Sequence, residues 1–349
     1  MFKPRHLFKK RQLLLGASAI ALVSTCAIAA DLPVNGQITA GSGHISQSGN
    51  TMTVNQSSGS MAANWDSFSI GRGNTVNFVQ PSSNSVAMNR VLGSDVSVIQ
   101  GALNANGKVF IVNPNGVLFT PSSQVNVGGL VASTRNISTE DFMSGNYKFE
   151  GNNSNSIINQ GNIITPQGGT VALIAAKIIN QGTIETPKGN TLFGAGNKIR
   201  LDLGGPVKLE VEEGAIEALI EQGGAIKADG GYVYLTAKAA SNLASATINH
   251  TGITEAKTMA TGEKGEIILL GDMQGGTLNA GGTLDASAPG NGDGGFIETS
   301  AAHVNTQPGL KVNASSKNGK AGDWLDRYVQ FAPISRLAAP DISRTGAAG

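Results

Sequence analysis

The feature that most constrains the fold is a repeat in the middle of the chain. Residues 158–166 read INQGNIITP and residues 179–187 read INQGTIETP, at an offset of 179 − 158 = 21. The same frame returns at residues 224–231, where the offset from Ile184 to Ile226 is 226 − 184 = 42, which we interpret as two periods. A period in the twenties is typical of a solenoid, in which each repeat packs only against its neighbours.

Each repeat reads as a set of short strands and turns. Apolar residues alternate with others in the frame G-x-I-x-A-x-G-G-x-V-x-L, and glycine or asparagine separates the apolar runs. Alternation with a period of two predicts strands, and the spacing lacks the fixed leucines of a leucine-rich repeat. We therefore predict a β-helix, in which residues 31–310 would form about 13 coils of ~21 residues each.

Stacking of coils explains which residues recur. Inward isoleucine, valine and leucine side chains would pile on their equivalents one coil away, and Asn159 would lie over Asn180 in a ladder of side-chain amides. Residues 208–222, KLEVEEGAIEALIEQ, also fit a helical pattern. Because Gly214 interrupts this segment and the repeat frame resumes at Gly223, we predict strands there as well.

The first thirty residues have the features of an export signal. Lysines and arginines precede an uncharged apolar segment at residues 13–23, and small residues follow in the expected cleavage region, at Ala27, Ala29 and Ala30. A retained anchor and a lipoprotein site at Cys26 are the alternatives. Cys26 is the only cysteine, so the processed chain would form neither a disulfide nor a thiolate metal site.

Composition supports a narrow, stacked structure and excludes one class of partner. The chain has 47 glycines and only 14% charged residues, against about 25% in ordinary globular domains. Its formal net charge of +1 provides no electrostatic footprint for nucleic acid.

The sharpest turn signal is the sequence Asn113-Pro114-Asn115-Gly116, which separates two apolar runs. Proline fixes one backbone dihedral of a turn, and Asn115 and Gly116 both tolerate positive φ. We therefore predict a strand, a tight turn and a second strand at this position.

Several motifs in order resemble those of one protein family. They are residues 64–71 (NWDSFSIG), residues 89–91 (NRV), residues 113–116 (NPNG) and residues 128–134 (GGLVAST). This series behind a signal sequence resembles the secretion domain of filamentous-haemagglutinin-type exoproteins, the secreted partners of bacterial two-partner secretion systems.

The resemblance implies both a fold and a function. The implied fold is all-β: a single-stranded right-handed parallel β-helix (solenoid) with an N-terminal β cap and extra-helical hairpins. The implied partner is an outer-membrane β-barrel transporter with periplasmic docking domains, which would export the chain through the periplasm and outer membrane to the cell surface or the medium. The implied activity is adhesion or haemagglutination. The residues carried over as transporter recognition or structural motifs are Asn89, Arg90, Val91, Asn113, Pro114, Asn115 and Gly116.

We divide the chain into four segments. Residues 1–30 are the signal peptide, residues 31–150 the N-terminal cap and first coils, and residues 151–310 the repeat coils. Residues 311–349 lack the repeat frame, and we expect an irregular tail of truncated or frame-shifted origin.

No catalytic, metal or cofactor site is predicted. His44, His250 and His303 have no neighbouring cysteine, aspartate or histidine at ligand spacing. Two alternatives to a secretion domain stay open. One is a stand-alone adhesive module that binds a host-cell surface or a glycan. The other is a carbohydrate-active β-helix enzyme, whose carboxylates would come from the acids clustered at Glu210, Glu212, Glu213, Glu217 and Glu221.

Overall fold

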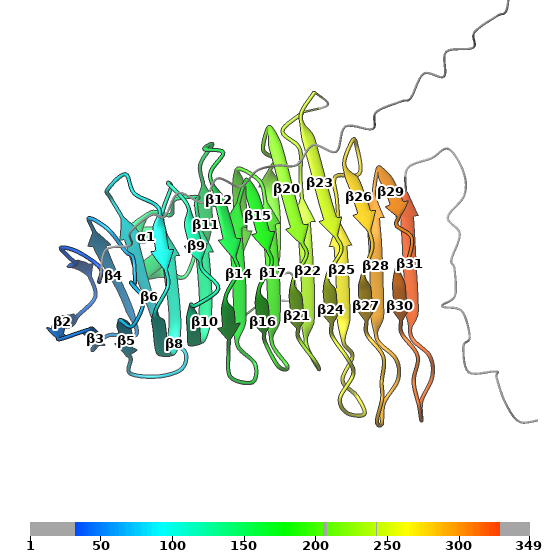
Figure 1. The fold of residues 1–349 in the computed structure, drawn as a ribbon, viewed down its shortest axis with the longest axis horizontal. Helices are drawn as coiled ribbons and strands as arrows, with labels where there is room; N and C mark the ends of the chain where they lie inside the picture. Colours follow the sequence, from blue (N-terminus) through cyan, green and yellow to red (C-terminus); the bar gives the residue numbers. More distant parts are fainter. Residues whose placement is uncertain (1–31, 205–207, 242, 329–349) are drawn as a thin grey trace, which may run out of the picture.

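A computed structural model describes residues 32–204, 208–241 and 243–328, and it forms a rod of stacked coils (Figure 1). Apart from the short helix α1 (Thr139–Ser144), the elements of this described part are strands. Most of them pair in parallel with the strands one coil before and one coil after. The predicted β-helix is therefore confirmed.

Three faces surround the core of the rod. Face 1 consists of β3 (Thr51–Gln56), β5 (Thr75–Val79), the first parts of β8 (Ala102–Val112) and β10 (Gln124–Ser133), β13 (Asn162–Ile164), β16 (Thr183–Glu185), β21 (Ala225–Lys227), β24 (Ile253–Glu255), β27 (Thr283–Asp285) and β30 (Lys311–Asn313). Face 2 consists of β1 (Gln37–Ala40), β4 (Ser60–Trp65), β6 (Val86–Val91), the second parts of β8 and β10, β14 (Thr170–Ala175), β17 (Asn190–Ala195), β22 (Tyr232–Ala237), β25 (Glu266–Leu270), β28 (Phe296–Ala301) and β31 (Asp323–Tyr328). Face 3 consists of β7 (Ser97–Ile99), β9 (Val117–Phe119), β12 (Ser156–Asn159), β15 (Lys177–Asn180), β20 (Glu217–Gln222), β23 (Ser245–His250), β26 (Thr277–Ala280) and β29 (His303–Thr306).

The two long strands turn the corner between faces 1 and 2. Residues 102–105 of β8 pair with β5, whereas residues 108–112 pair with β6. Gly107 and Gly128 stack at this bend, and a Cβ on Gly128 would lie 2.7 Å from the carbonyl oxygen of Gly107. Glycine is therefore required where the coils approach most closely.

Antiparallel pairing occurs at the first end of the rod and in an added sheet. At the first end, β2 (Gly43–Ser48) pairs antiparallel with β3, and β1 pairs antiparallel with β4. Parallel coils begin where β3 pairs with β5. The added sheet lies outside face 2 and consists of β11 (Tyr147–Glu150), β18 (Lys198–Leu201) and β19 (Leu209–Glu213). Strands β19 and β20 confirm the prediction of strands for residues 208–222.

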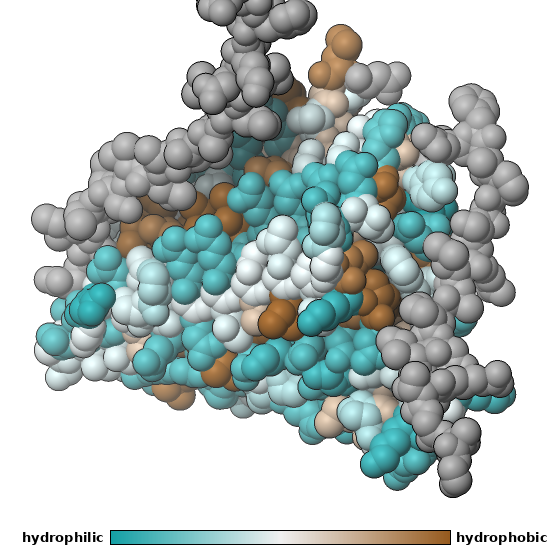
Figure 2. All heavy atoms as spheres, turned by 45° about the vertical axis from the view of Figure 1, so that its right-hand side comes forward, coloured by the Kyte–Doolittle hydropathy of each residue, from teal (hydrophilic) through white to brown (hydrophobic). Residues whose placement is uncertain are grey.

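Two hydrophobic cores result from this arrangement. The first fills the interior of the coils with stacked aliphatic side chains such as Ile157, Ile178 and Ile220. The second lies between the outer surface of face 2 and its cover, where Phe110 packs against Phe142 of α1 with ring centroids 5.2 Å apart. Each such buried side chain contributes about 1.5–3 kcal/mol. The outer surface seen in Figure 2 is mostly hydrophilic, with separate hydrophobic patches.

The coil count differs from our expectation for a definite reason. Ile158 pairs with Ile179, as an offset of one period predicts. Ile184, however, pairs directly with Ile226, so the segment between these two isoleucines is one enlarged coil and not two periods. The extra length contains the β18–β19 hairpin. The later coils are also longer than 21 residues, since Ile226 pairs with Thr254, Thr254 with Leu284 and Leu284 with Val312. Face 1 therefore holds ten strands among the described residues, fewer than the 13 coils predicted.

The expected irregular tail also begins later than residue 310. Strands β30 and β31 continue faces 1 and 2, and Val312 and Trp324 pack against the first core. Residues 329–349, which we also placed in the tail, lie outside the described residues, as does the signal-cleavage region at Ala27, Ala29 and Ala30.

Candidate functional site

The sequence from Asn113 to Gly116 forms a corner between face 2 and face 3. It connects the end of β8 to β9, which belong to different faces, so the two strands do not form a hairpin. The Asn113 side-chain oxygen accepts a bond from the Asn115 N–H at 2.9 Å, and the Gly116 N–H donates to the Asn113 carbonyl at 3.1 Å. The predicted tight turn is therefore present.

Gly116 is the one residue of this corner with positive φ. Its φ is +120°, whereas the described non-glycine residues with positive φ are Asn35 and Lys188. Asn115 tolerates positive φ but does not adopt it here. Asn115 instead stabilises the corner through the hydrogen bonds of its side-chain amide.

The corner is fastened to the preceding coil by side-chain amides. The Asn113 amide nitrogen donates to the Asp95 carbonyl and to the Ser97 hydroxyl, both at 2.9 Å. The Asn115 amide nitrogen donates to the Gly93 carbonyl at 2.8 Å. Asn113 is fully buried and its polar atoms are satisfied, so the net stabilisation comes from several bonds of about 1 kcal/mol each.

The following coil reaches the same corner. Asn155 donates its amide N–H to the Pro114 carbonyl at 2.8 Å. A Cβ on Gly116 would lie 3.1 Å from the carbonyl oxygen of Ser156, so this position is restricted by both space and φ. Four consecutive residues thus hold three successive coils in register.

Asn89 and Val91 are buried on β6. The Asn89 side-chain oxygen accepts a bond from the Trp65 indole N–H at 3.0 Å, and its nitrogen donates to the Phe110 carbonyl at 3.2 Å. Asn89 is fully buried and Val91 is 3% exposed. These two members of the NRV motif therefore hold neighbouring strands together in the folded rod.

Arg90 points away from the core and fastens the cover. Its guanidinium donates to Asn136 Oδ1 at 3.1 Å, to Thr139 Oγ1 at 3.0 Å and to the Ile137 carbonyl. Burial lowers its pKa below the usual arginine value. These bonds connect β6 to residues 136–139.

Sequence reasoning missed Arg135, which is fully buried. Its Nε donates to the Gly196 carbonyl at 2.8 Å, Nη1 to the Asn153 carbonyl at 2.9 Å, and Nη2 to Asn197 Oδ1 at 3.2 Å. Burial lowers its pKa to about 10. The only signal in the sequence is an arginine next to an apolar strand, which does not reveal partners as distant along the chain as Gly196 and Asn197.

The buried amide ladder is longer than predicted. Asn159 donates to Asn180 at 2.8 Å, and Asn180 donates to Gln222 at 2.7 Å. His250 lies next in register after Gln222. The Nδ1 of His250 donates to the Gly281 carbonyl at 2.7 Å, and Nε2 accepts from the Thr254 hydroxyl at 2.8 Å. These bonds hold a neutral imidazole, and burial lowers its pKa to about 4.

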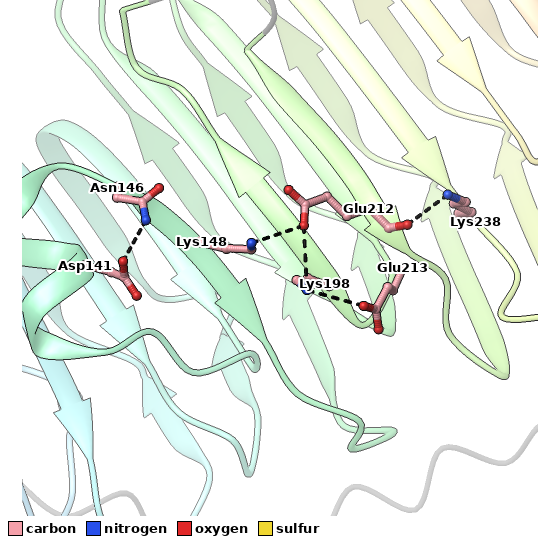
Figure 3. Close-up of polar contacts among 7 residues, drawn as sticks. All are labelled: Asp141, Asn146, Lys148, Lys198, Glu212, Glu213 and Lys238. Atoms are coloured by element: carbon pink, nitrogen blue, oxygen red, sulfur yellow. Dashed lines mark hydrogen bonds and ion pairs between the residues drawn. The ribbon is translucent and has the colours of Figure 1, made fainter.

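Three of the five acids proposed for an enzymatic site, Glu212, Glu213 and Glu217, pair with lysines, and Figure 3 shows the first two. Glu212 lies 3.6 Å from Lys148 and 3.9 Å from Lys198, and Glu213 lies 3.4 Å from Lys198. These contacts hold β11, β18 and β19 together. The ammonium of Lys238 also donates to the Glu212 carbonyl at 2.9 Å, on the free edge of β19. Glu217 lies on face 3 and pairs with Lys177 at 2.6 Å.

The histidines do not share a site. His44 lies at the first end of the rod beside Asn55, His250 is in the core, and His303 is exposed on β29. Within the described ranges, no three histidine, cysteine, aspartate or glutamate side chains come close enough to hold a metal ion. In the same ranges, no helix has the length and apolar character needed to cross a membrane.

Comparison with known proteins identifies a family model that matches most of the chain. The model for the TPS secretion domain matches residues 29–286. Two curated relatives, each named heme/hemopexin-binding protein and each from Haemophilus influenzae, are 46% identical over 114 residues and 38% identical over 141 residues. The alignments cover 33% and 39% of this chain but only 13% and 15% of the relatives.

One solved structure supports the fold. The HMW1 secretion domain from Haemophilus influenzae superposes with a TM-score of 0.67 at 23% identity, over 85% of this chain and 96% of that one. The filamentous hemagglutinin secretion domain matches with a TM-score of 0.46 at 17% identity, over 82% of this chain and 99% of that one.

Proposed function

Because the chain belongs to the family of TPS secretion domains, we propose that it directs a two-partner exoprotein to its outer-membrane transporter in the periplasm and folds into the rod outside the cell. The segment proposed for recognition is residues 89–134, which contains the NRV and NPNG motifs. The exported protein would then be released or held at the cell surface. The family is one of secretion domains and not of enzymes, which agrees with the lysine-paired acids described above.

One observation carries the proposal that recognition precedes folding. Asn89, Val91 and Asn113 are at most 3% exposed in the finished rod, whereas Arg90, Pro114 and Asn115 keep part of their surface. A partner that contacted the whole set would therefore meet it only in an unfolded chain. The apolar runs around Pro114 would be extended in that state and are suited to adding a strand to a periplasmic domain through main-chain hydrogen bonds.

Folding outside the cell would then favour export in one direction. Each coil buries apolar surface only on a coil that already exists, so folding propagates along the rod. The amide bonds at Asn113 and Asn115 close only when the coil before them is in place. Completed coils would thus resist return through the transporter.

Secretion of a Gly116→Val variant tests the proposal. Valine opposes the +120° φ of Gly116 and approaches the Ser156 carbonyl, so we expect less secreted protein in cells that hold the cognate transporter. Gly168→Val is the matched control, because Gly168 also has positive φ, +82°, but faces open space and lies outside residues 89–134.

Two results would count against this proposal. If wild-type chain is secreted equally with and without the transporter, the transporter is not its partner. If Gly168→Val lowers secretion as much as Gly116→Val, backbone strain anywhere in the rod explains the loss, and closure of the corner at Gly116 has no special part in export.

A second candidate function is binding to a surface or a ligand outside the cell. Each of the two curated relatives is named a heme/hemopexin-binding protein, and the alignments span only 13% and 15% of their lengths. We propose that any haem-related binding in such exoproteins depends on the parts outside these alignments. The rod itself presents a further candidate binding surface, which lies on the outward side of face 1 and is described in the next section.

A further inference from the structure

The outward surface of face 1 changes its chemistry along the rod. On the first coils, most outward positions carry uncharged amides and hydroxyls, and the apolar exceptions include Ala102 and Ile164. We call this surface the amide strip; it consists of Thr53, Asn77, Asn104, Gln124, Asn126 and Asn162. From β16 onward the row that contains Asn77, Asn104 and Asn126 continues with charged residues, Glu185, Lys227, Glu255 and Asp285 in successive coils. The row of Gln124 and Asn162 continues with the uncharged residues Thr183, Ala225 and Ile253. The boundary falls between β13 and β16.

The amides of the strip are held in a row. Asn77 is in register with Asn104, and Asn104 with Asn126, so their side chains repeat at the spacing of about 4.8 Å between strands. The Asn104 amide nitrogen donates to Asn77 Oδ1 at 3.0 Å. A primary amide has two N–H groups and an oxygen with two lone pairs. The bond between Asn104 and Asn77 uses one N–H group and one lone pair, and the remaining donors and acceptors of these amides can face solvent.

Two hollows lie along this row and share Asn126. The first has a volume of about 560 Å³ and includes Asn77 and Asn104 in its lining, and the second has a volume of about 530 Å³ and includes Gln124 and Asn162. The volumes fall in the range of small-ligand sites, but the first hollow is a shallow, open depression and the second is only half enclosed. Their linings contain no aspartate, glutamate, lysine or arginine from the described part of the chain.

A buried hydroxyl in the second hollow has no protein partner. Ser123 is 2% exposed and lines this hollow, yet its Oγ makes no hydrogen bond within the described structure. Leaving a buried polar group unsatisfied is costly. The Oγ itself is buried beside Gly161, where an added Cβ would lie 1.9 Å from it, so this hydroxyl borders the hollow without opening into it.

We propose that the amide strip binds an uncharged, polyhydroxylated ligand, namely a segment of neutral glycan lying across successive coils. Sugar hydroxyls both donate and accept, as the free amide groups of the strip do. Val79, which is 52% exposed and lines the first hollow, supplies an apolar contact for ring carbons. The ligand would thus be fixed by many weak, directional bonds and not by charge.

The lining argues against the other classes of ligand. Anionic glycans and nucleic acids need lysine or arginine, which both hollows lack among the described residues. Protein interfaces are enriched in exposed aromatic side chains, methionine and arginine. The one aromatic residue that the described structure places in either lining, Phe78, is only 3% exposed. A neutral glycan is the partner whose chemistry matches the surface.

Binding of the purified chain to neutral oligosaccharides tests this proposal. Immobilised hexose and N-acetylhexosamine oligomers are the probes, with sulfated oligosaccharides beside them. Asn126→Ala removes the residue shared by both hollows, and Asn126→Asp keeps its size but loses its N–H donors. Asn279→Ala is the matched control, since Asn279 belongs to an outward amide ladder on face 3, between Asn249 and Asn305.

We expect the chain to bind a neutral oligosaccharide with little dependence on salt. Both Asn126 variants should weaken binding about fivefold to tenfold, as expected for the loss of one or two neutral hydrogen bonds, and Asn279→Ala should leave it unchanged. Failure to bind any neutral oligosaccharide would overturn the proposal. So would binding restricted to sulfated probes, or equal weakening by Asn279→Ala. No transporter takes part in this measurement, so a negative result leaves the proposed secretion function standing.

Discussion

The side-chain amide of Asn159 donates to the side-chain oxygen of Asn180 at 2.8 Å, and both residues are fully buried. Asn180 in turn donates to Gln222 at 2.7 Å. The bonds of this ladder run along the rod, so a single side chain is bonded to the coils on both sides. Removal of the middle member therefore leaves two buried groups without partners.

Substitution of Asn180 tests the energetic weight of this ladder. Asn180→Ala would leave the Asn159 donor and the Gln222 acceptor unsatisfied, at about 1–3 kcal/mol for each group. We expect the urea midpoint of unfolding to fall clearly, and far more than for Asn279→Ala in the exposed ladder. Equal midpoints for the two variants would show that burial of the ladder does not matter.

The pH dependence of stability should reveal His250. Its pKa is lowered from 6.5 to about 4 by burial, so the folded rod holds the neutral ring. The free energy of unfolding has its full value with respect to His250 above pH 6.5. It decreases as the pH falls from 6.5 towards 4, because the unfolded chain then binds a proton that the folded chain excludes. The difference of 6.5 − 4 = 2.5 corresponds to about 3 kcal/mol.

Urea midpoints measured between pH 4 and pH 8 would check this dependence. His250→Gln should flatten the acid side of the profile relative to wild type, whatever its effect on stability at pH 8. His303→Gln serves as the control, because His303 is exposed. Parallel profiles for wild type and His250→Gln would contradict the assignment.

Lys188 occupies a strained corner between faces 1 and 2. Its φ is +52°, and equivalent corners one coil away are glycines, Gly168 and Gly230. Left-handed backbone costs a non-glycine residue about 1–2 kcal/mol. We expect Lys188→Gly to stabilise the rod by about 1 kcal/mol, since a flexible residue also costs entropy on folding.

Lys188→Ala separates this strain from the ion pair with Glu263. Alanine removes the 2.9 Å contact but keeps the strain, and an exposed pair contributes at most ~1 kcal/mol. Thermal unfolding of the two variants should therefore rank glycine above wild type and alanine at or below it. A glycine variant less stable than alanine would show that strain at this corner is negligible.

Arg135 should control the attachment of the added sheet. Arg135→Ala leaves carbonyls at Gly196 and Asn153 without a donor, and Arg135→Lys cannot reproduce the planar fork of the guanidinium. We expect both variants to expose the β18–β19 hairpin to limited proteolysis before the coils unfold. Cleavage at unchanged rates would mean that the lysine–glutamate contacts are sufficient to hold the sheet.

The sequence predicted the parts of this fold that depend on local pattern. Alternation and turn residues indicated the strands. The shared sequence INQG, which starts at Ile158 and again at Ile179, indicated one period of the repeat. The same pattern gave a wrong prediction between Ile184 and Ile226, where we expected two coils and the structure has one. The β18–β19 hairpin lengthens this coil by roughly one period, and length alone cannot distinguish an insertion from a repeat. Long loops separate β27 from β28 and β30 from β31, and they interrupt the repeat spacing. For this reason the strand that contains Trp324 was not recognised in the sequence.

The local turn at the candidate site was predictable from the sequence, but its contacts with other coils were not. The turn at Asn113 followed from its residue types. That its amide reaches Asp95 and Ser97 depends on which corners stack, which only the register of the coils decides. Arg135 was missed for the same reason, since its acceptors are brought close by the added sheet.

The enlarged coil shows what the corners of this architecture can accommodate. Between Ile184 and Ile226 the chain departs to build the β18–β19 hairpin and then returns with the two isoleucines in direct register. The scaffold therefore keeps its internal alignment independent of whatever projects at a vertex. An engineer could graft a foreign loop or small module at such a vertex and expect the neighbouring rungs to remain undisturbed.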